Sequence, residues 1–347
     1  MNYKWLFFCL PLGLTLHYLD ANPILVFISS AIAIIPLANL LGDATEDMSH
    51  SLGAAKGGLL NSTMGTVPDL IIGFFALQQG LIEMVKASIT GAIIGNLLFG
   101  LGLSILVGGL KNKAQLKYDR GVTHVYSSLL LLATFGLIIP AVFEHSVESD
   151  IEISLNISVI LLLIYLSSVV FTLTNTQSNI QSAPVKPSVD NNSFLVVNTK
   201  PLFSLVSAGI GLAIMSEIMT EAIGPTAADL GLSPIFAGVF LLAPIGMVSE
   251  LINTVRFSRQ NKLDISLALT LGSSTQIGLL VSPLLVFMGL GIGQKMDLLF
   301  SKFEVIAIIL SVAAVNHILH LGAVSWVSGP KLIGIYFMLG IAFYNIP

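Results

Sequence analysis

Two carboxylates occur inside apolar segments, where charge is costly. Asp69 lies in the stretch GGLLNSTMGTVPDLIIGFFAL, and Glu250 lies in the stretch IFAGVFLLAPIGMVSELINTV. An acidic side chain at the centre of a bilayer costs about 2.5–3.5 kcal/mol on insertion scales, so such residues generally mark ion pathways. We therefore expect Asp69 and Glu250 to bind a cation and to carry protons in turn.

Hard oxygen ligands surround both acids in the sequence. Hydroxyl side chains precede each acid, and a side-chain amide follows each one at nearly the same spacing in the next apolar segment. Carboxylate, hydroxyl and amide oxygens suit Ca²⁺, Mn²⁺ or Na⁺. The predicted metal ligands are Asp69, Glu250, Ser62, Thr66, Asn96, Ser249 and Gln276.

Prolines and glycines near the acids predict broken helices. Pro68 immediately precedes Asp69, Pro244 lies six residues before the second acid, and Gly65 and Gly246 each lie four residues before an acid. Proline removes a backbone donor and interrupts a helix. Carbonyl oxygens freed in this way can coordinate an ion, which a membrane tolerates only where the break lines a cavity.

The segments containing the two acids resemble each other. Residues 44–49 and 215–220 both contain the pattern hydroxyl–Glu–x–Met–hydroxyl, and each is followed by Gly-x-Val-x-carboxylate at 65–69 and 246–250. This similarity predicts an internal repeat. The acids of the upstream patterns, Glu46 and Glu217, are candidate residues of the ion pathway.

The composition indicates that most of the surface faces lipid. Of 347 residues, 54% are hydrophobic and 10% charged, whereas a soluble domain has about 25% charged residues. The net charge of −4 offers no basic surface for nucleic acid, and the single cysteine, Cys9, excludes an internal disulfide. Apolar stretches of about 20 residues predict about eleven spans: 4–19, 23–41, 57–78, 86–109, 122–143, 153–173, 201–222, 232–255, 264–291, 304–321 and 329–346.

Loop charges predict the orientation of these spans. The basic loops at 111–120 and 256–262 are expected in the cytoplasm, and the acidic segment 144–152 outside. The N-terminus is then cytoplasmic, and the acidic stretch 43–47 is expected in a cytoplasmic loop. Because the two similar segments then cross in opposite senses, the repeats are predicted to be inverted.

The expected fold is therefore an all-α polytopic membrane protein of two inverted five-helix repeats plus one N-terminal helix. The polar residues 174–200 cannot bury enough apolar area to order themselves and are predicted to be a cytoplasmic linker. The predicted divisions are an N-terminal transmembrane helix (1–21), a first repeat (22–173), the linker (174–200) and a second repeat (201–347).

Two groups of motifs resemble a known family. The run LGDATEDMSHSLGAAKGGLLNSTMG and the span 87–102 resemble the first repeat of calcium/proton exchangers, within the calcium/cation antiporter superfamily, and GSSTQI resembles the second repeat. The resemblance implies that Asp69 and Glu250 bind Ca²⁺ and protons alternately while a sliding gating bundle switches access. The chain departs from the family pattern at Thr66 and Met247, where the family has asparagine, and at Asp69, where it has glutamate.

The predicted function is secondary active exchange of Ca²⁺, or a similar divalent cation, for H⁺, with the bilayer as surroundings and no cofactor. Burial favours the neutral acids and a bound cation favours the charged acids, so protons and metal compete. The string Gly-Thr-Val-Pro-Asp resembles sodium/calcium exchangers and makes Na⁺ the alternative counter-ion. A passive cation channel or an ion-sensing membrane protein is the other alternative. An enzyme is disfavoured, because the chain has no HExxH or Gly-x-Ser-x-Gly motif.

Overall fold

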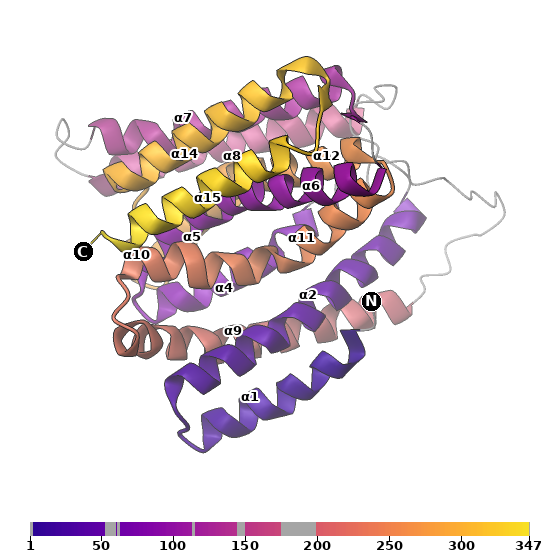
Figure 1. Ribbon diagram of the computed structural model, residues 1–347. Helices are drawn as coiled ribbons and strands as arrows, with labels where there is room; N and C mark the ends of the chain where they lie inside the picture. The colour runs from indigo at the N-terminus through magenta and orange to yellow at the C-terminus, as the bar shows by residue number, and fades with distance from the viewer. Residues whose placement is uncertain are drawn as a thin grey trace.

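The protein is described by a computed structural model that covers residues 3–52, 60, 63–112, 115–143, 150–174 and 199–346. These residues are almost entirely helical (Figure 1). The α-helices are α1 (Cys9–Tyr18), α2 (Pro23–Leu52), α4 (Val67–Gln78), α5 (Ile82–Ile94), α6 (Leu101–Asn112), α7 (Arg120–Phe143), α8 (Asp150–Thr174), α9 (Thr199–Asp229), α10 (Pro234–Ala237), α11 (Ala243–Arg259), α12 (Leu263–Gln276), α13 (Ser282–Gly291), α14 (Lys302–Ile318) and α15 (Ser328–Tyr344).

Shorter elements complete the described part of the chain. Three π-helical segments join α-helices end to end: η2 (Gly95–Gly100), η4 (Gly238–Leu242) and η5 (Ile277–Val281). Two 3-10 helices are η1 (Tyr3–Phe8) and η6 (Leu319–Leu321). The strands β1 (Leu116–Lys117) and β2 (Ala323–Val324) pair antiparallel and tie the loop after α6 to the loop after α14.

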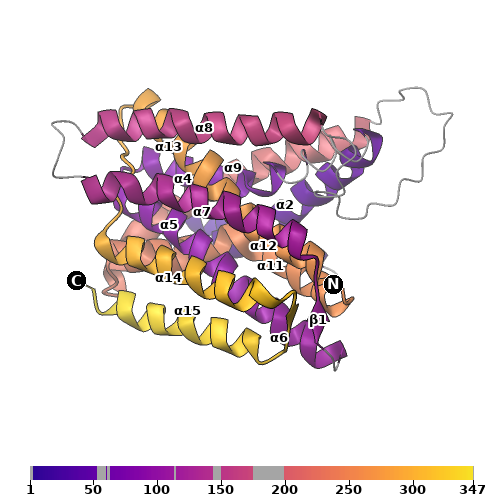
Figure 2. The ribbon, with the colours of Figure 1, turned by 90° about the horizontal axis from the view of Figure 1, so that it is seen from above.

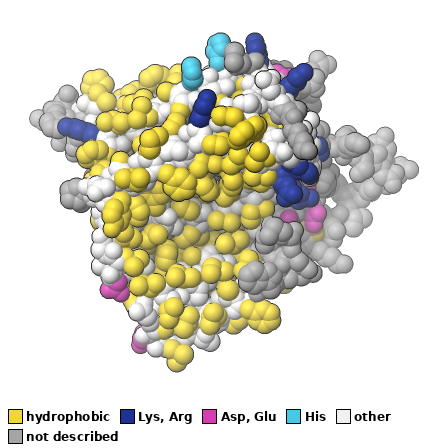
Figure 3. All heavy atoms as spheres, in the orientation of Figure 1, with side chains coloured by type: hydrophobic (Ala, Val, Ile, Leu, Met, Phe, Trp, Pro, Cys, Tyr) yellow, Lys and Arg dark blue, Asp and Glu magenta, His cyan; other side chains and the backbone are white. Residues whose placement is uncertain are grey.

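The surface confirms a multi-pass membrane protein. Within the described ranges, seven helices are long and apolar enough to cross a bilayer. Large apolar side chains such as Phe203 and Ile210 are exposed on α9. Figure 3 shows hydrophobic side chains across one whole face, with charged groups mainly toward its margins. Apolar patches of this extent are typical of surfaces that face lipid.

The described helices form a smaller group, made of α1, α2 and α9, and a larger group, made of the remaining helices. In Figure 1, α1, α2 and α9 lie together at the bottom of the view, and α2 packs closely along α9. Figure 2, which looks down from the top of Figure 1, shows α8, α7, α14 and α15 side by side in the layer nearest the viewer, on the side away from α1. Within the larger group, α4 and α11 face the smaller group: α4 contacts α9, and α11 contacts α2.

The helix ends correct one prediction. Residues 43–47, expected in a loop, lie within α2, which continues to Leu52, and the side chains of Asp43, Glu46 and Asp47 are exposed. Hydropathy detects where a segment leaves lipid, whereas helix geometry continues until a breaking residue, and 43–52 contains neither glycine nor proline. The eleven-span count and the repeat boundaries stay predictions. Most of the predicted linker, 175–198, and residues 144–149 lie outside the described residues.

Candidate cation site

The helix that carries Asp69 begins where an earlier helical segment is interrupted. Residues 63–65 are helical, Thr66 forms a turn, and α4 starts at Val67. The carbonyl of Thr63 accepts hydrogen bonds from Thr66 N at 3.3 Å and from Thr66 Oγ1 at 3.0 Å. Because Pro68 has no N–H, the carbonyl of Met64 lacks the donor that a continuous helix would supply.

The second acid lies on a less interrupted helix. Glu250 is in α11, which follows directly from the π-helical segment η4. Pro244 lies in the first turn of α11, directly after η4, so its missing N–H leaves a carbonyl of that preceding turn without a helical donor. The sequence predicts a broken helix before each acid. In the structure the helix is interrupted at Thr66 before Asp69, whereas before Glu250 the helix continues through a π-helical segment. Such segments occur often at functional sites because they re-aim side chains.

The structure brings Asp69 and Glu250 together. A Cβ on Gly65 would lie 3.4 Å from Glu250 Oε1, and a Cβ on Gly246 would overlap Asp69 Oδ1. Each carboxylate thus lies against the glycine of the other acid's motif, and the two charges interact electrostatically. Glycine is required at position 246, because only a residue without a side chain leaves room for the carboxylate.

Two side chains hold the carboxylate of Glu250. Ser273 Oγ on α12 donates to Oε1 at 2.6 Å, and Asn96 Nδ2 in η2 donates to Oε2 at 3.3 Å. Hydrogen bonds to an ionised acceptor are about twice as strong as neutral ones. Asn96 was a predicted ligand. Ser273 was missing from the predicted ligand set, although it lies in the Gly-Ser-Ser-Thr-Gln string that the sequence singled out.

The surroundings of Asp69 are largely apolar. Its half-buried carboxylate receives no hydrogen bond from any side chain in the described ranges. It lines a cavity of about 20 Å³, which is room for about one water molecule. Ser88 Oγ, also in the wall, donates to the carbonyl of Val85 at 2.8 Å. The other lining residues are Ile72, Ile89, Ala92, Leu242, Ala243, Ile277, Val281 and Leu285.

The remaining predicted ligands are less engaged. Ser62 lies outside the described residues. Thr66 is buried beside the break, and its hydroxyl donates to Thr63 while keeping lone pairs free to accept. Ser249 and Gln276 are half-buried, and neither side chain has a hydrogen-bond partner in the described part of the chain. In that part, His, Cys, Asp and Glu side chains form no group of three or more suited to a metal.

The candidate pathway residues lie on the closely packed pair of helices α2 and α9. Glu46 on α2 and Glu217 on α9 are both exposed. Neither side chain forms a hydrogen bond or ion pair with a residue that the structure describes. Their role in an ion pathway stays a prediction.

A tyrosine far along the chain contacts the helix break. Tyr165 on α8 is buried, and its hydroxyl lies 2.9 Å from Thr63 Oγ1. Thr63 is the residue whose carbonyl closes the turn at Thr66. Nothing in the sequence pattern indicated Tyr165, because the contact joins residues 102 positions apart.

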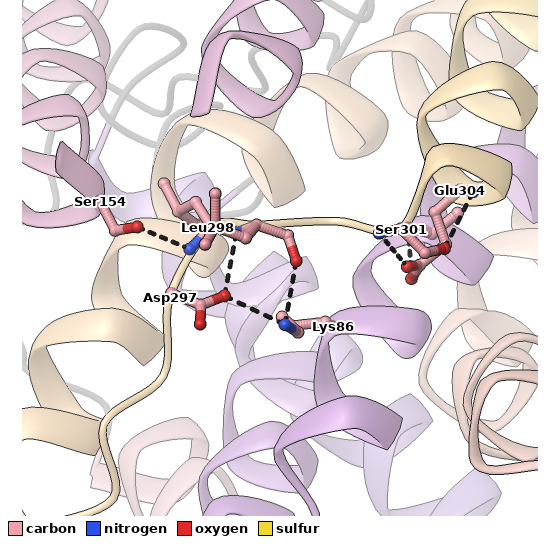
Figure 4. Close-up of polar contacts among 8 residues, drawn as sticks. Lys86, Ser154, Asp297, Leu298, Ser301 and Glu304 are labelled. Atoms are coloured by element: carbon pink, nitrogen blue, oxygen red, sulfur yellow. Dashed lines mark hydrogen bonds and ion pairs between the residues drawn. The ribbon is translucent and has the colours of Figure 1, made fainter. Parts of the chain in front are cut away.

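A polar cluster fixes the helix that lines the Asp69 cavity. Lys86 Nζ on α5 donates to Asp297 Oδ1 at 3.0 Å and to the carbonyl of Leu299 at 2.9 Å (Figure 4). Thr90 Oγ1, one turn further along α5, donates to Glu304 Oε1 at 3.2 Å. These contacts tie α5 to the extended segment between α13 and α14 and to the first turn of α14.

Apolar spanning helices and two carboxylates meeting at a helix break define the class of this protein as a polytopic membrane transporter. A family model described as sodium/calcium exchanger protein matches residues 22–174 and 200–344, so the chain belongs to that family. This confirms the resemblance to the calcium/cation antiporters. The protein is a transporter and not an enzyme.

Relatives and solved structures extend along the whole chain. The Ca²⁺/H⁺ antiporter of Aphanothece halophytica is 35% identical and aligns with 100% of this chain and 98% of its own length. The Ca²⁺/H⁺ antiporter ChaA of Bacillus subtilis is 31% identical, with coverages of 96% and 95%. The native structure of YfkE superposes with a TM-score of 0.84 at 30% identity and 100% coverage of both chains. The H⁺/Ca²⁺ exchanger CAX shares the fold, with a TM-score of 0.76 at 16% identity and coverages of 99% and 91%.

Proposed function

We propose that this protein is a secondary active antiporter that exchanges Ca²⁺, or a similar divalent cation, for H⁺ at Asp69 and Glu250. The carrying observation is the reciprocal packing in which each carboxylate lies against the glycine of the other motif. Supporting it are the antiporters of Aphanothece halophytica and Bacillus subtilis, related over nearly their whole length.

The chemistry follows from charge balance. When both acids are ionised, their two negative charges match one divalent cation, and oxygen ligands complete its shell. When both are protonated, the empty site is neutral and can change access without carrying charge through a medium of low dielectric constant. Further ligands in this proposal are Ser62, Thr66, Asn96, Ser249 and Gln276, together with the carbonyl of Met64.

The architecture proposed for this exchange is a pair of inverted five-helix repeats, 22–173 and 201–347, after an N-terminal helix with a cytoplasmic start. Supporting it are reciprocal contacts: α15 packs on η2 of the first repeat, and α8 packs on η5 of the second. The two π-helical segments also occupy similar places in the long helices 82–112 and 263–291. Sliding of the paired helices α2 and α9 against the larger group is the proposed means of alternating access.

The proposal is tested by ⁴⁵Ca²⁺ uptake into proteoliposomes with an imposed pH gradient, an imposed Na⁺ gradient or no gradient. We expect uptake driven by the pH gradient for the wild type and at least a tenfold loss in Asp69→Asn and Glu250→Gln. Asp229→Asn, an exposed acid at the end of α9, is the matched control. Equal uptake by all four proteins would reject the site. Uptake driven only by the Na⁺ gradient would show that the counter-ion is Na⁺ and not H⁺. Uptake without any gradient would indicate a channel.

A further inference from the structure

The two acids lie at equivalent positions of the two motifs but have different partners. Ser273, which donates to Glu250, lies 23 positions after it, and the residue at the same offset from Asp69 is Ala92. Asn96, the other donor to Glu250, follows Asp69 in the sequence, and the residue at the same offset from Glu250 is Ile277. Both polar partners of Glu250 therefore have apolar counterparts.

If the two halves of the site are equivalent, the apolar counterparts should lie beside Asp69, and in the structure they do. Ala92 and Ile277 both line the cavity that contains Asp69. These two offsets thus lead to the same places around each acid, and at both of them the group beside Glu250 is polar and the group beside Asp69 is apolar. At matched offsets Asn96 corresponds to Ile277. Asn96 and Gln276 are similarly placed amides in the sequence, but their offsets from the two acids differ by one residue.

A second pair of residues supports this register. The offset that leads from Glu250 to Gln276 leads from Asp69 to Gly95, which makes Gly95 the counterpart of Gln276. Met247 is likewise the counterpart of Thr66. A Cβ on Gly95 would lie only 2.7 Å from Met247 Sδ, so the large Met247 is accommodated by the absence of a side chain at Gly95. The two halves of the site have diverged in compensating ways, as close packing demands.

We infer that the cation site is one-sided: the ion is held mainly by the Glu250 half, and Ala92 and Ile277 set its affinity by denying ligands to the Asp69 half. This inference rests on the proposed function. Asn96 keeps its amide oxygen and Ser273 keeps its hydroxyl lone pairs, so both can coordinate the ion while donating to Glu250. On the Asp69 side the matched positions add no ligand, so the carboxylate is supplemented there only by the segment before it, which includes Thr66 and the carbonyl of Met64, and by water in the adjoining cavity.

The test is equilibrium binding of ⁴⁵Ca²⁺ to the full chain in detergent, with Mg²⁺ as a competing probe. We expect Glu250→Gln to raise the Kd for Ca²⁺ about 100-fold and Asp69→Asn to raise it about tenfold, because Ser273 and Asn96 orient the Glu250 carboxylate whereas no side chain in the described ranges donates to Asp69. Ser273→Ala is expected to raise the Kd about tenfold, and Ser273→Thr to restore most of the loss. The mirror change Ala92→Ser is expected to lower the Kd about threefold, since it adds an oxygen on the ligand-poor side.

The outcomes separate this inference from the proposed function. Equal weakening by Asp69→Asn and Glu250→Gln, together with no gain from Ala92→Ser, would overturn the one-sided site while leaving the exchange site intact. Unchanged Ca²⁺ binding in both acid variants would instead reject the proposed site itself. Size-exclusion profiles identify any variant that fails to fold, and Ala92→Ser still decides the question because its hydroxyl adds one atom beside a cavity.

Discussion

Asp69 Oδ1 occupies the space in which any side chain at Gly246 would have to begin. The contact joins α4 to α11 across the site, and in the mirror arrangement a Cβ on Gly65 would lie 3.4 Å from Glu250 Oε1. The two glycines are therefore spacers that let the two carboxylates pack against each other's helix. A Cβ would overlap Asp69 at Gly246 but would fit at Gly65, so alanine substitutions can distinguish the roles of the two glycines.

Gly246→Ala is expected to lower the rate of Ca²⁺ uptake at least tenfold, because its Cβ displaces the Asp69 carboxylate. Gly65→Ala is expected to lower it less than threefold, since a Cβ 3.4 Å from Glu250 Oε1 makes an ordinary van der Waals contact. Gly209→Ala on α9 is the control, because nothing lies within 4 Å of its Cβ position. Proteoliposome uptake measures all three. Equal rates in Gly246→Ala and Gly65→Ala would contradict the arrangement.

Tyr165→Phe is expected to weaken Ca²⁺ transport by raising KM about fivefold while expression is unchanged. The substitution removes a hydroxyl that contacts Thr63 at 2.9 Å, and one such hydrogen bond contributes about 1 kcal/mol. Thr63→Val should have a similar effect. The double variant Tyr165→Phe/Thr63→Val should be no worse than either single variant, because both remove the same bond. Fully additive losses would show that the two residues act separately.

Lys86→Met is expected to lower the free energy of unfolding by about 1–3 kcal/mol, because it leaves Asp297 and the carbonyl of Leu299 without their donor. The side chains of Lys86 and Asp297 are only 12% and 24% exposed, so water replaces the lost bonds poorly. Asp297→Asn should cost less, since Lys86 keeps its bond to Leu299. Thermal unfolding in detergent measures the difference. A Lys86→Met variant as stable as the wild type would show that the cluster does not hold α5.

Gly91→Ala is expected to cost about 1–3 kcal/mol of stability through overpacking. Its Cβ would lie 2.6 Å from the carbonyl oxygen of Val239, which is backbone and cannot move aside. Gly95→Ala should cost less, because the obstacle is the flexible end of Met247. The double variant Gly95→Ala/Met247→Thr should recover the loss. Thermal unfolding in detergent compares these variants, and an equal cost for both glycines would contradict this account.

The sequence predicted the elements of the site better than their contacts. Asp69, Glu250, Asn96 and the break at Pro68 could be singled out in the sequence because a carboxylate, an amide or a proline in an apolar span is costly and therefore conspicuous. Ser273 was passed over in favour of Gln276. Hydroxyl groups in apolar spans are common, since they can bond to their own helix backbone, and so they give a weak signal.

What the sequence alone determined is the class of the protein: spanning helices, two acids within apolar segments and related motifs, all of which are recorded in local composition and spacing. Only the tertiary structure decided which groups meet. It paired Glu250 with Asn96 and Ser273, and it placed Ile277 and Ala92 around Asp69. The physical reason is that hydropathy is summed along one helix, whereas a contact between residues 154 positions apart depends on how two helices rotate and slide against each other.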